Sequence, residues 1–242
     1  MDALIYTAMS GAERALKGQQ VHANNLANMD SAGFRADMEM STAVSLQNGS
    51  GYDDRHMSQL QANTVSTRGG TVKETGRDLD VAFAGDGYLA AQFQDGESYT
   101  RAGAMTLGAD GALTVNGHAV LGEGGPIVLP VHSRLAIGTD GTISLQVPGA
   151  AAMQAVDKIK LVRAEGSELR KNEAGLLVTR NGQPLPTDPA AQVRAGFLEG
   201  SNVSAVEEMV ATMSLNRTFE VQMKLFKASD SMNEVGNRLL GA

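Results

Sequence analysis

The chain has 242 residues, of which 42% are hydrophobic and only 4% aromatic, and it contains neither tryptophan nor cysteine. A net charge of -7 without a basic stripe argues against nucleic acid or an anionic membrane as partner, because clustered Lys and Arg dominate binding to phosphate. The absence of cysteine excludes disulfides and thiolate metal sites. The length suits one substantial domain with appendages, or two small domains.

The first segment, 1–36, is predicted to be a helix followed by a turn. Gly11 and Gly18 each cost about 1 kcal/mol relative to Ala within a helix, so this helix should be marginal alone. Residues 28–33 are rich in types that end helices. Residues spaced alternately by four and three predict a heptad seam for a partner helix. These are Ile5, Met9, Ala12, Leu16, Gln19, Ala23 and Leu26.

The segment 37–75 is predicted to be an extended connector. From residue 47 onward it is rich in Ser, Thr, Gly, Gln and Asn, and it shows no convincing periodicity.

The segment 76–197 is predicted to be an all-β domain. Five Asp-Gly or Asn-Gly dipeptides, at residues 95, 110, 116, 140 and 181, favour type I′ hairpin turns between short β-prone runs. Those runs are Leu79 to Phe83, Tyr88 to Gln94, Leu113 to Val115, Ile127 to Val131, Ile143 to Val147, Ile159 to Val162 and Leu176 to Thr179.

The segment 198–242 is predicted to hold a long helix that ends at Leu240. Ser204 and Glu207 fit a capping box at its start. One side carries Met209, Met213, Phe219, Met223 and Phe226, and another carries Val210, Val221, Leu225, Met232 and Leu239. Because one partner helix cannot cover both sides, we expect the first side to face the N-terminal seam and the second to face neighbouring subunits. The predicted class is α+β, with a central all-β domain flanked by helices that pair as a coiled-coil-like hairpin.

No catalytic or cofactor-binding constellation is predicted. The four histidines are scattered without a metal-ligand spacing. Asp78 and Asp80 would share a strand face without a partner for acid–base chemistry, and pairing with Arg77 or Arg101 is the favoured interpretation. Gly85-Asp-Gly87 is predicted to be a strand turn rather than a phosphate loop. We expect no enzyme, no cofactor and no metal.

Several segments, in order along nearly the whole chain, resemble the signatures of the flagellar axial proteins, the family that contains the rod, hook and hook-associated proteins. They are Asn24-Asn-Leu-Ala-Asn28, Gly33-Phe-Arg35, Thr75 to Val81, Gly85 to Tyr88, Tyr99-Thr-Arg-Ala-Gly103 and Gly196 to Val203. The opening residues and modest length resemble the proximal rod proteins most, with the distal rod proteins as the alternative.

The resemblance implies a non-enzymatic structural subunit that assembles with itself and other rod proteins, and possibly with hook-side axial proteins. It also implies export by the flagellar type III apparatus, without a cleaved signal, into a rod that spans the periplasm, and no direct lipid anchor. A monomeric β-domain binding module, or a hydrolase using Asp78 or Asp80, remains a rival interpretation.

The expected assembly interface combines helix-seam residues with signature residues. We expect changes at Asn28 or Gly33 to impair assembly more than stability. The full set is Ile5, Met9, Ala12, Leu16, Asn24, Asn25, Leu26, Ala27, Asn28, Gly33, Phe34, Ser201, Asn202, Val203, Met209, Met213, Phe219, Met223, Leu225 and Phe226.

Overall fold

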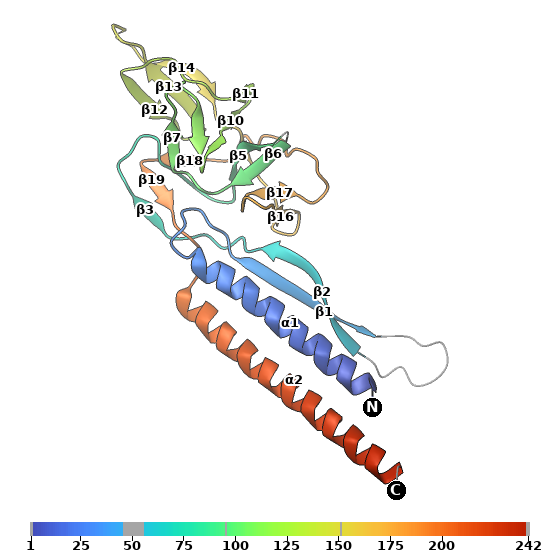
Figure 1. Cartoon of the computed structure of the whole chain (residues 1–242). Coiled ribbons are helices and arrows are strands. Elements are labelled where there is room, and N and C mark those ends of the chain that lie inside the picture. The colour runs from blue at the N-terminus through green and yellow to red at the C-terminus, as the bar shows by residue number, and fades with distance from the viewer. Residues whose placement is uncertain (1, 46–55, 95, 151, 241–242) are drawn as a thin grey trace. The chain divides into compact units, whose positions relative to one another are not determined.

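The structure, a computed structural model, describes residues 2–45, 56–94, 96–150 and 152–240 (Figure 1). The chain forms two compact units. The helical unit comprises Met1–Ala27, Asp37–Thr64 and Ser204–Ala242, and the β unit comprises Asn28–Ala36 and Val65–Val203. A β-rich middle between two terminal helices confirms the predicted α+β class.

In the helical unit, α1 (Asp2–Ala27) and α2 (Ala205–Leu240) contact each other and run antiparallel (Figure 1). The register is set by Gly11 beside Gln222 and by a 2.8 Å hydrogen bond from the Gln19 side chain to Asn216. Ser204 caps α2 as predicted, because its Oγ lies 3.5 Å from the amide nitrogen of Glu207.

The helical unit also contains a two-stranded sheet of β1 (Asp37–Ser45) and β2 (His56–Val65). Both strands lie in the segment predicted to be an extended connector. The sequence analysis did not predict their pairing, since their polar composition hides the alternation of a half-buried strand.

The β unit is built from short antiparallel ladders. The largest sheet has the order β15 (Leu161–Val162), β5 (Tyr88–Phe93), β6 (Gly96–Thr100), β17 (Leu177–Thr179) and β16 (Leu169–Lys171). One three-stranded sheet has the order β12 (Arg134–Ile137), β13 (Thr142–Gln146) and β14 (Gln154–Lys158). A second three-stranded sheet has the order β7 (Met105–Leu107), β8 (Leu113–Val115) and β9 (His118–Ala119). The pairs are β18 (Val193–Ala195) with β4 (Val81–Phe83), β19 (Phe197–Glu199) with β3 (Val72–Glu74), and β10 (Leu121–Gly122) with β11 (Gly125–Pro126).

Six of the seven predicted β-prone runs contain a strand, and the exception is the run that begins at Ile127. Ile127 is fully buried, but its neighbour Val128 makes only an isolated bridge to Ala112. The core around Ile127 packs aliphatic side chains such as Leu113, Ile143 and Ile159, which fits the composition.

Only one of the described Asx-Gly turns has both residues at positive φ. Asn116 and Gly117 have φ of 50° and 80°, as a type I′ turn requires. At Asp110-Gly111 and Asp140-Gly141 only the glycine is positive, and the glycine amide donates to the carbonyl three residues earlier, at 3.0 Å. These are type I turns followed by a left-handed glycine, so the type I′ prediction is wrong there. Asp95 lies outside the described residues.

Two glycines with the same backbone conformation give a matched test of packing in the β unit. Gly111 has φ 81°, and an added Cβ would lie 2.3 Å from the Leu129 carbonyl oxygen. Gly117 has φ 80° with nothing within 4 Å. Gly117→Ala should lower the free energy of unfolding by about 1 kcal/mol, and Gly111→Ala by roughly 3 kcal/mol, because it also disrupts the turn's contact with Leu129. Urea denaturation measures both, and equal losses would contradict the packing described.

Candidate functional site

A buried carboxylate and two guanidinium groups form the most highly charged part of the β unit interior. Glu199, at the end of β19, accepts hydrogen bonds at Oε2 from Arg101 Nε and Nη2, at 2.9 and 2.8 Å. Its Oε1 lies 2.8 Å from Arg35 Nη2 and 2.8 Å from the Gly70 amide nitrogen. The three charged side chains are 2 to 5% exposed. The carboxylate therefore joins three chain segments that are distant in sequence.

Arg101 also binds the backbone of the glycine-containing turn between β4 and β5. Its Nη1 donates to the carbonyls of Gly85 and Gly87, both at 2.6 Å. Its guanidinium lies 4.8 Å from the Phe83 ring centroid. The interpretation of residues 85–87 as a strand turn fits this contact, since the carbonyls face a protein cation.

The segments that follow α1 and precede α2 in sequence are hydrogen-bonded to each other within the β unit. The Gly33 amide donates to the Glu199 carbonyl at 2.8 Å, and Asn202 Oδ1 accepts from the Ala36 amide at 2.7 Å. Gly33 has φ 67°, and an added Cβ would lie 2.1 Å from the Ala102 nitrogen. Gly33 is thus packed on the β unit, so its replacement should lower stability, and the expectation that assembly suffers more than stability stays a prediction.

The three asparagines of the first signature have different surroundings. Asn25 is 1% exposed, and it exchanges two hydrogen bonds with the backbone of Asp37, at 2.9 and 3.0 Å, as a neighbouring strand would. Asn28, in the β unit, accepts from the Ser31 amide and hydroxyl in a turn. Asn24 is exposed. Asn25 therefore anchors β1 to α1, while Asn28 shapes the chain after the helix.

The face of α1 that contacts α2 matches the predicted seam only in part, because the seam residue Gln19 bonds to Asn216 of α2 while the seam's Met9 and Leu16 are exposed. Ala8, Ala15, Gly18 and Asn25 are buried, whereas Met9 is 57% exposed and Leu16 is 45% exposed. These four buried positions are spaced by seven, three and seven residues, and each lies one residue before a predicted seam position, which is about 100° around a helix. Small and polar residues thus form the contact, and much of the predicted apolar seam faces solvent.

On α2 the face toward α1 is also polar or small at several positions. Glu208, Leu215, Gln222 and Ser229 recur every seven residues, and Glu208 bonds to His22 and, at 3.3 Å, to Asn25. Phe219 is partly buried and Phe226 is 37% exposed. The expected inner position of three methionines is wrong, because Met209, Met213 and Met223 are 45, 62 and 38% exposed.

A second apolar face of α2 is exposed. Val221, Leu225, Met232, Val235 and Leu239 are 45 to 77% exposed and recur mostly at spacings of three and four. The expected outward position of Val221, Leu225 and Met232 fits this face. The remaining expected interface residues are Ile5, Ala12, Leu26, Ala27, Phe34, Ser201 and Val203, which are partly or fully exposed.

One of the two carboxylates considered for catalysis, Asp80, is engaged in structure. Asp80 is 3% exposed and lies 3.2 Å from Arg77, as the pairing interpretation expected. Among the described residues no group of three His, Cys, Asp or Glu is placed to hold a metal ion. The search of the described helices likewise found none with the length and apolarity to cross a membrane.

The charge balance of the Glu199 cluster predicts unequal costs for two substitutions. Glu199→Gln leaves two buried guanidiniums without an anion and should lower the free energy of unfolding by about 3 to 5 kcal/mol. Arg35→Met keeps the pair of Glu199 with Arg101 and should cost clearly less. Chemical denaturation of both variants measures the difference, and a greater loss for Arg35→Met would contradict this view of the cluster.

Three family models match successive parts of the chain. A model described as flagella basal body rod protein matches residues 5–35. The D1 domain of the flagellar hook protein FlgE/F/G matches residues 82–145. The C-terminal region of the flagellar basal body rod FlgEFG protein matches residues 194–239.

Full-length relatives agree with these matches. The chain is 40% identical to flagellar basal-body rod protein FlgF of Salmonella typhimurium and of Escherichia coli K12, covering 99% of each sequence. It is 28% identical to rod protein FlgG of Buchnera aphidicola, over 94% of this chain and 96% of that protein. With the helix, β unit and helix architecture, these similarities show that the chain belongs to the flagellar basal-body rod protein family and is FlgF-like.

Proposed function

We propose that this chain is a structural subunit of the proximal flagellar rod and that it polymerises through the exposed apolar faces of α1 and α2. The observation that carries the proposal is the second apolar face of α2, which extends from Val221 to Leu239. Such a row of exposed side chains at heptad spacing is the pattern with which a helix packs on another helix. Apolar surface of this kind marks an interaction site on a soluble protein.

The apolar face of α1 supports the same assignment. Tyr6, Met9 and Leu16 are 61, 57 and 45% exposed, on a side of α1 different from the one on which Ala8 and Ala15 are buried. A subunit with different apolar faces on two helices can make heterologous contacts with several neighbours. Where the rotation between neighbours does not close a ring, contacts of this kind generate a helical assembly.

The inner contact between the helices is suited to defining register more than to supplying strength. Gly11 lies beside Gln222 with little apolar area between the helices, and the polar groups of Asn25 and Glu208 specify the alignment. The larger apolar side chains are then available to neighbouring subunits. In dilute solution we expect the helix pair to be weak, since most helical stability comes from packing an apolar face.

The remaining features of the proposal follow from family membership and from the chemistry of the site. The identity of 40% to FlgF sequences, against 28% to a FlgG, favours the proximal over the distal rod. The partners are copies of this chain and other rod proteins, with hook-side axial proteins as further candidates. Export by the flagellar type III apparatus, a position across the periplasm, no enzymatic role and no lipid anchor complete the proposal. The burial and pairing of Asp80 weigh against the rival hydrolase.

A charge on the outer face of α2 should block assembly without unfolding the free chain. Leu225 is 45% exposed in the subunit, so Leu225→Asp should change helicity and thermal stability little. In an assembled rod the same carboxylate would be buried, at a cost of several kcal/mol if unpaired. Recovery in purified basal bodies and swimming motility should therefore fall to background.

Two controls define the result. Leu225→Met keeps the face apolar and should assemble normally. Phe219→Asp places a charge on the side of α2 that contacts α1, and it should reduce the helicity of the free chain. Normal recovery of Leu225→Asp in basal bodies, or loss of helicity in the free Leu225→Asp chain, would contradict the proposed role of the outer face.

A further inference from the structure

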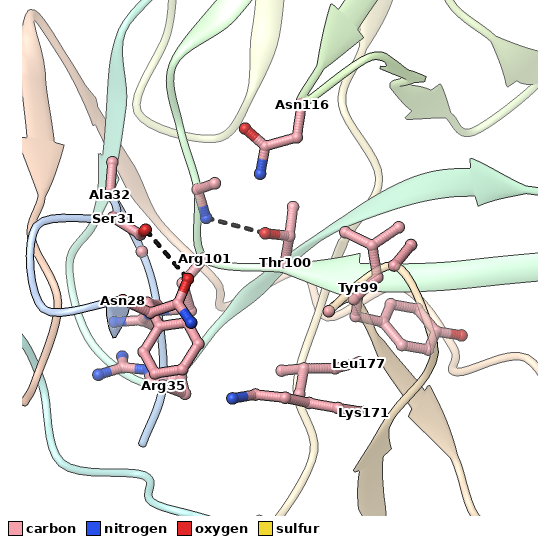
Figure 2. Close-up of a pocket in the computed structure, with 16 residues that line it drawn as sticks. Asn28, Ser31, Ala32, Arg35, Tyr99, Thr100, Arg101, Asn116, Lys171 and Leu177 are labelled. Carbon is pink, nitrogen blue, oxygen red and sulfur yellow. Dashed lines mark hydrogen bonds between the residues drawn. The ribbon is translucent and has the colours of Figure 1, made fainter. Parts of the chain in front are cut away.

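A cavity of about 160 Å³ lies within the β unit, beside the Glu199 cluster. Its lining comes from the turn after α1, the end of β6, the β8–β9 turn, and the β16–β17 hairpin. Figure 2 shows Asn116 reaching into this space from one side and Lys171 lying along the other. The volume exceeds that of a single water site many times over and accommodates a side-chain carboxylate.

The lining is cationic. It includes Arg35, Arg101 and Lys171 but no Asp or Glu. Lys171 places its ammonium nitrogen 3.7 Å from the centroid of the Phe34 ring, at the side of the cavity. Ionised side chains of one sign around a partly enclosed space raise the local concentration of the opposite charge.

The neighbouring buried cluster has more positive than negative charge. Arg35 and Arg101 contribute two positive charges and Glu199 one negative charge, which leaves a net charge of +1. Among the described residues, Glu199 is the only carboxylate within ion-pair distance of either guanidinium. Arg35 Nε has no hydrogen-bond partner in that part of the chain. Burial, and then the charge of Arg101, lower the pKa of Arg35, which is the direction expected for a cation without its full complement of anions.

We propose that this cavity binds a carboxylate group, supplied in the assembled rod by an acidic side chain of a second copy of the chain. One further carboxylate would give Arg35 and Arg101 one anion each. The amide of Asn116 provides an additional donor to the same space, and Lys171 adds a positive charge to its lining. The choice of a second copy rests on the proposed polymerisation and on composition, because 27 acidic residues against 20 basic ones give each neighbour a surplus of carboxylates.

The first experiment tests the cavity alone, in the free full-length chain. Sodium acetate is titrated into the isotopically labelled protein at constant ionic strength, with sodium chloride and inorganic phosphate in parallel titrations. Acetate should shift the Asn116 side-chain amide and the Ala102 backbone amide in NMR spectra along a saturable curve. Lys171→Gln should weaken that binding at least fivefold, and Lys73→Gln, an exposed cation on β3 outside the lining, should leave it unchanged. Absence of saturation with acetate, or tighter binding of phosphate, would overturn the assignment of a carboxylate site.

The second experiment tests the source of the carboxylate in cells. Lys171→Glu should reduce recovery in purified basal bodies at least tenfold while the melting temperature of the free chain stays within about 2 °C, and Lys73→Glu should be recovered normally. Acetate binding together with normal recovery of Lys171→Glu would overturn the second-copy occupant. Failure of the proposed function itself is a different result, because the unmodified chain would then be missing from basal bodies while its acetate binding persisted.

Discussion

The carboxylate of Glu199 is the interaction on which the arrangement of the β unit depends. It holds Arg101 from the end of β6 and Arg35 from the segment that follows α1, and it also accepts the amide of Gly70. A buried charge of this kind is tolerated only when its hydrogen bonds are made, so each segment requires the others. The signatures around residues 33–35, 85–88, 99–103 and 196–203 therefore meet at one buried group. Within the β unit, these bonds hold the segment that follows α1 in sequence against the segment that precedes α2.

The helical unit is organised by a different constraint. Its two helices contact each other through Gly11 and through polar groups such as Gln19 and Asn25, while Met9 and Leu16 on α1 and Leu225 on α2 remain accessible. Glycine and alanine allow a close approach but bury little apolar area, so the pair gains modest stability from packing. In a subunit built in this way, the larger apolar side chains of both helices are exposed to solvent. We propose that assembly with neighbouring subunits buries them.

The sequence predicted well those features that are local. The two terminal helices, the β-rich middle, the cap at Ser204 and the turn at Asn116-Gly117 each follow from residues close together in the chain. The seam of α1 was placed one residue away from its observed position, because a heptad pattern identifies the most apolar face without saying which partner covers it. Glu199 was not singled out, since its partner Arg101 is 98 residues away. The available signal was an acidic residue in a signature that follows three arginine-containing signatures, those with Arg35, Arg77 and Arg101.

The division between an inner polar seam and outer apolar faces can be measured directly by photo-crosslinking in purified basal bodies. A photoreactive amino acid at position 225 should form adducts between subunits, detected as species of higher mass. The same amino acid at position 222, beside Gly11, should crosslink α2 to α1 within one chain. The account would be contradicted if position 225 formed adducts only within one chain, or if position 222 formed adducts mainly between subunits.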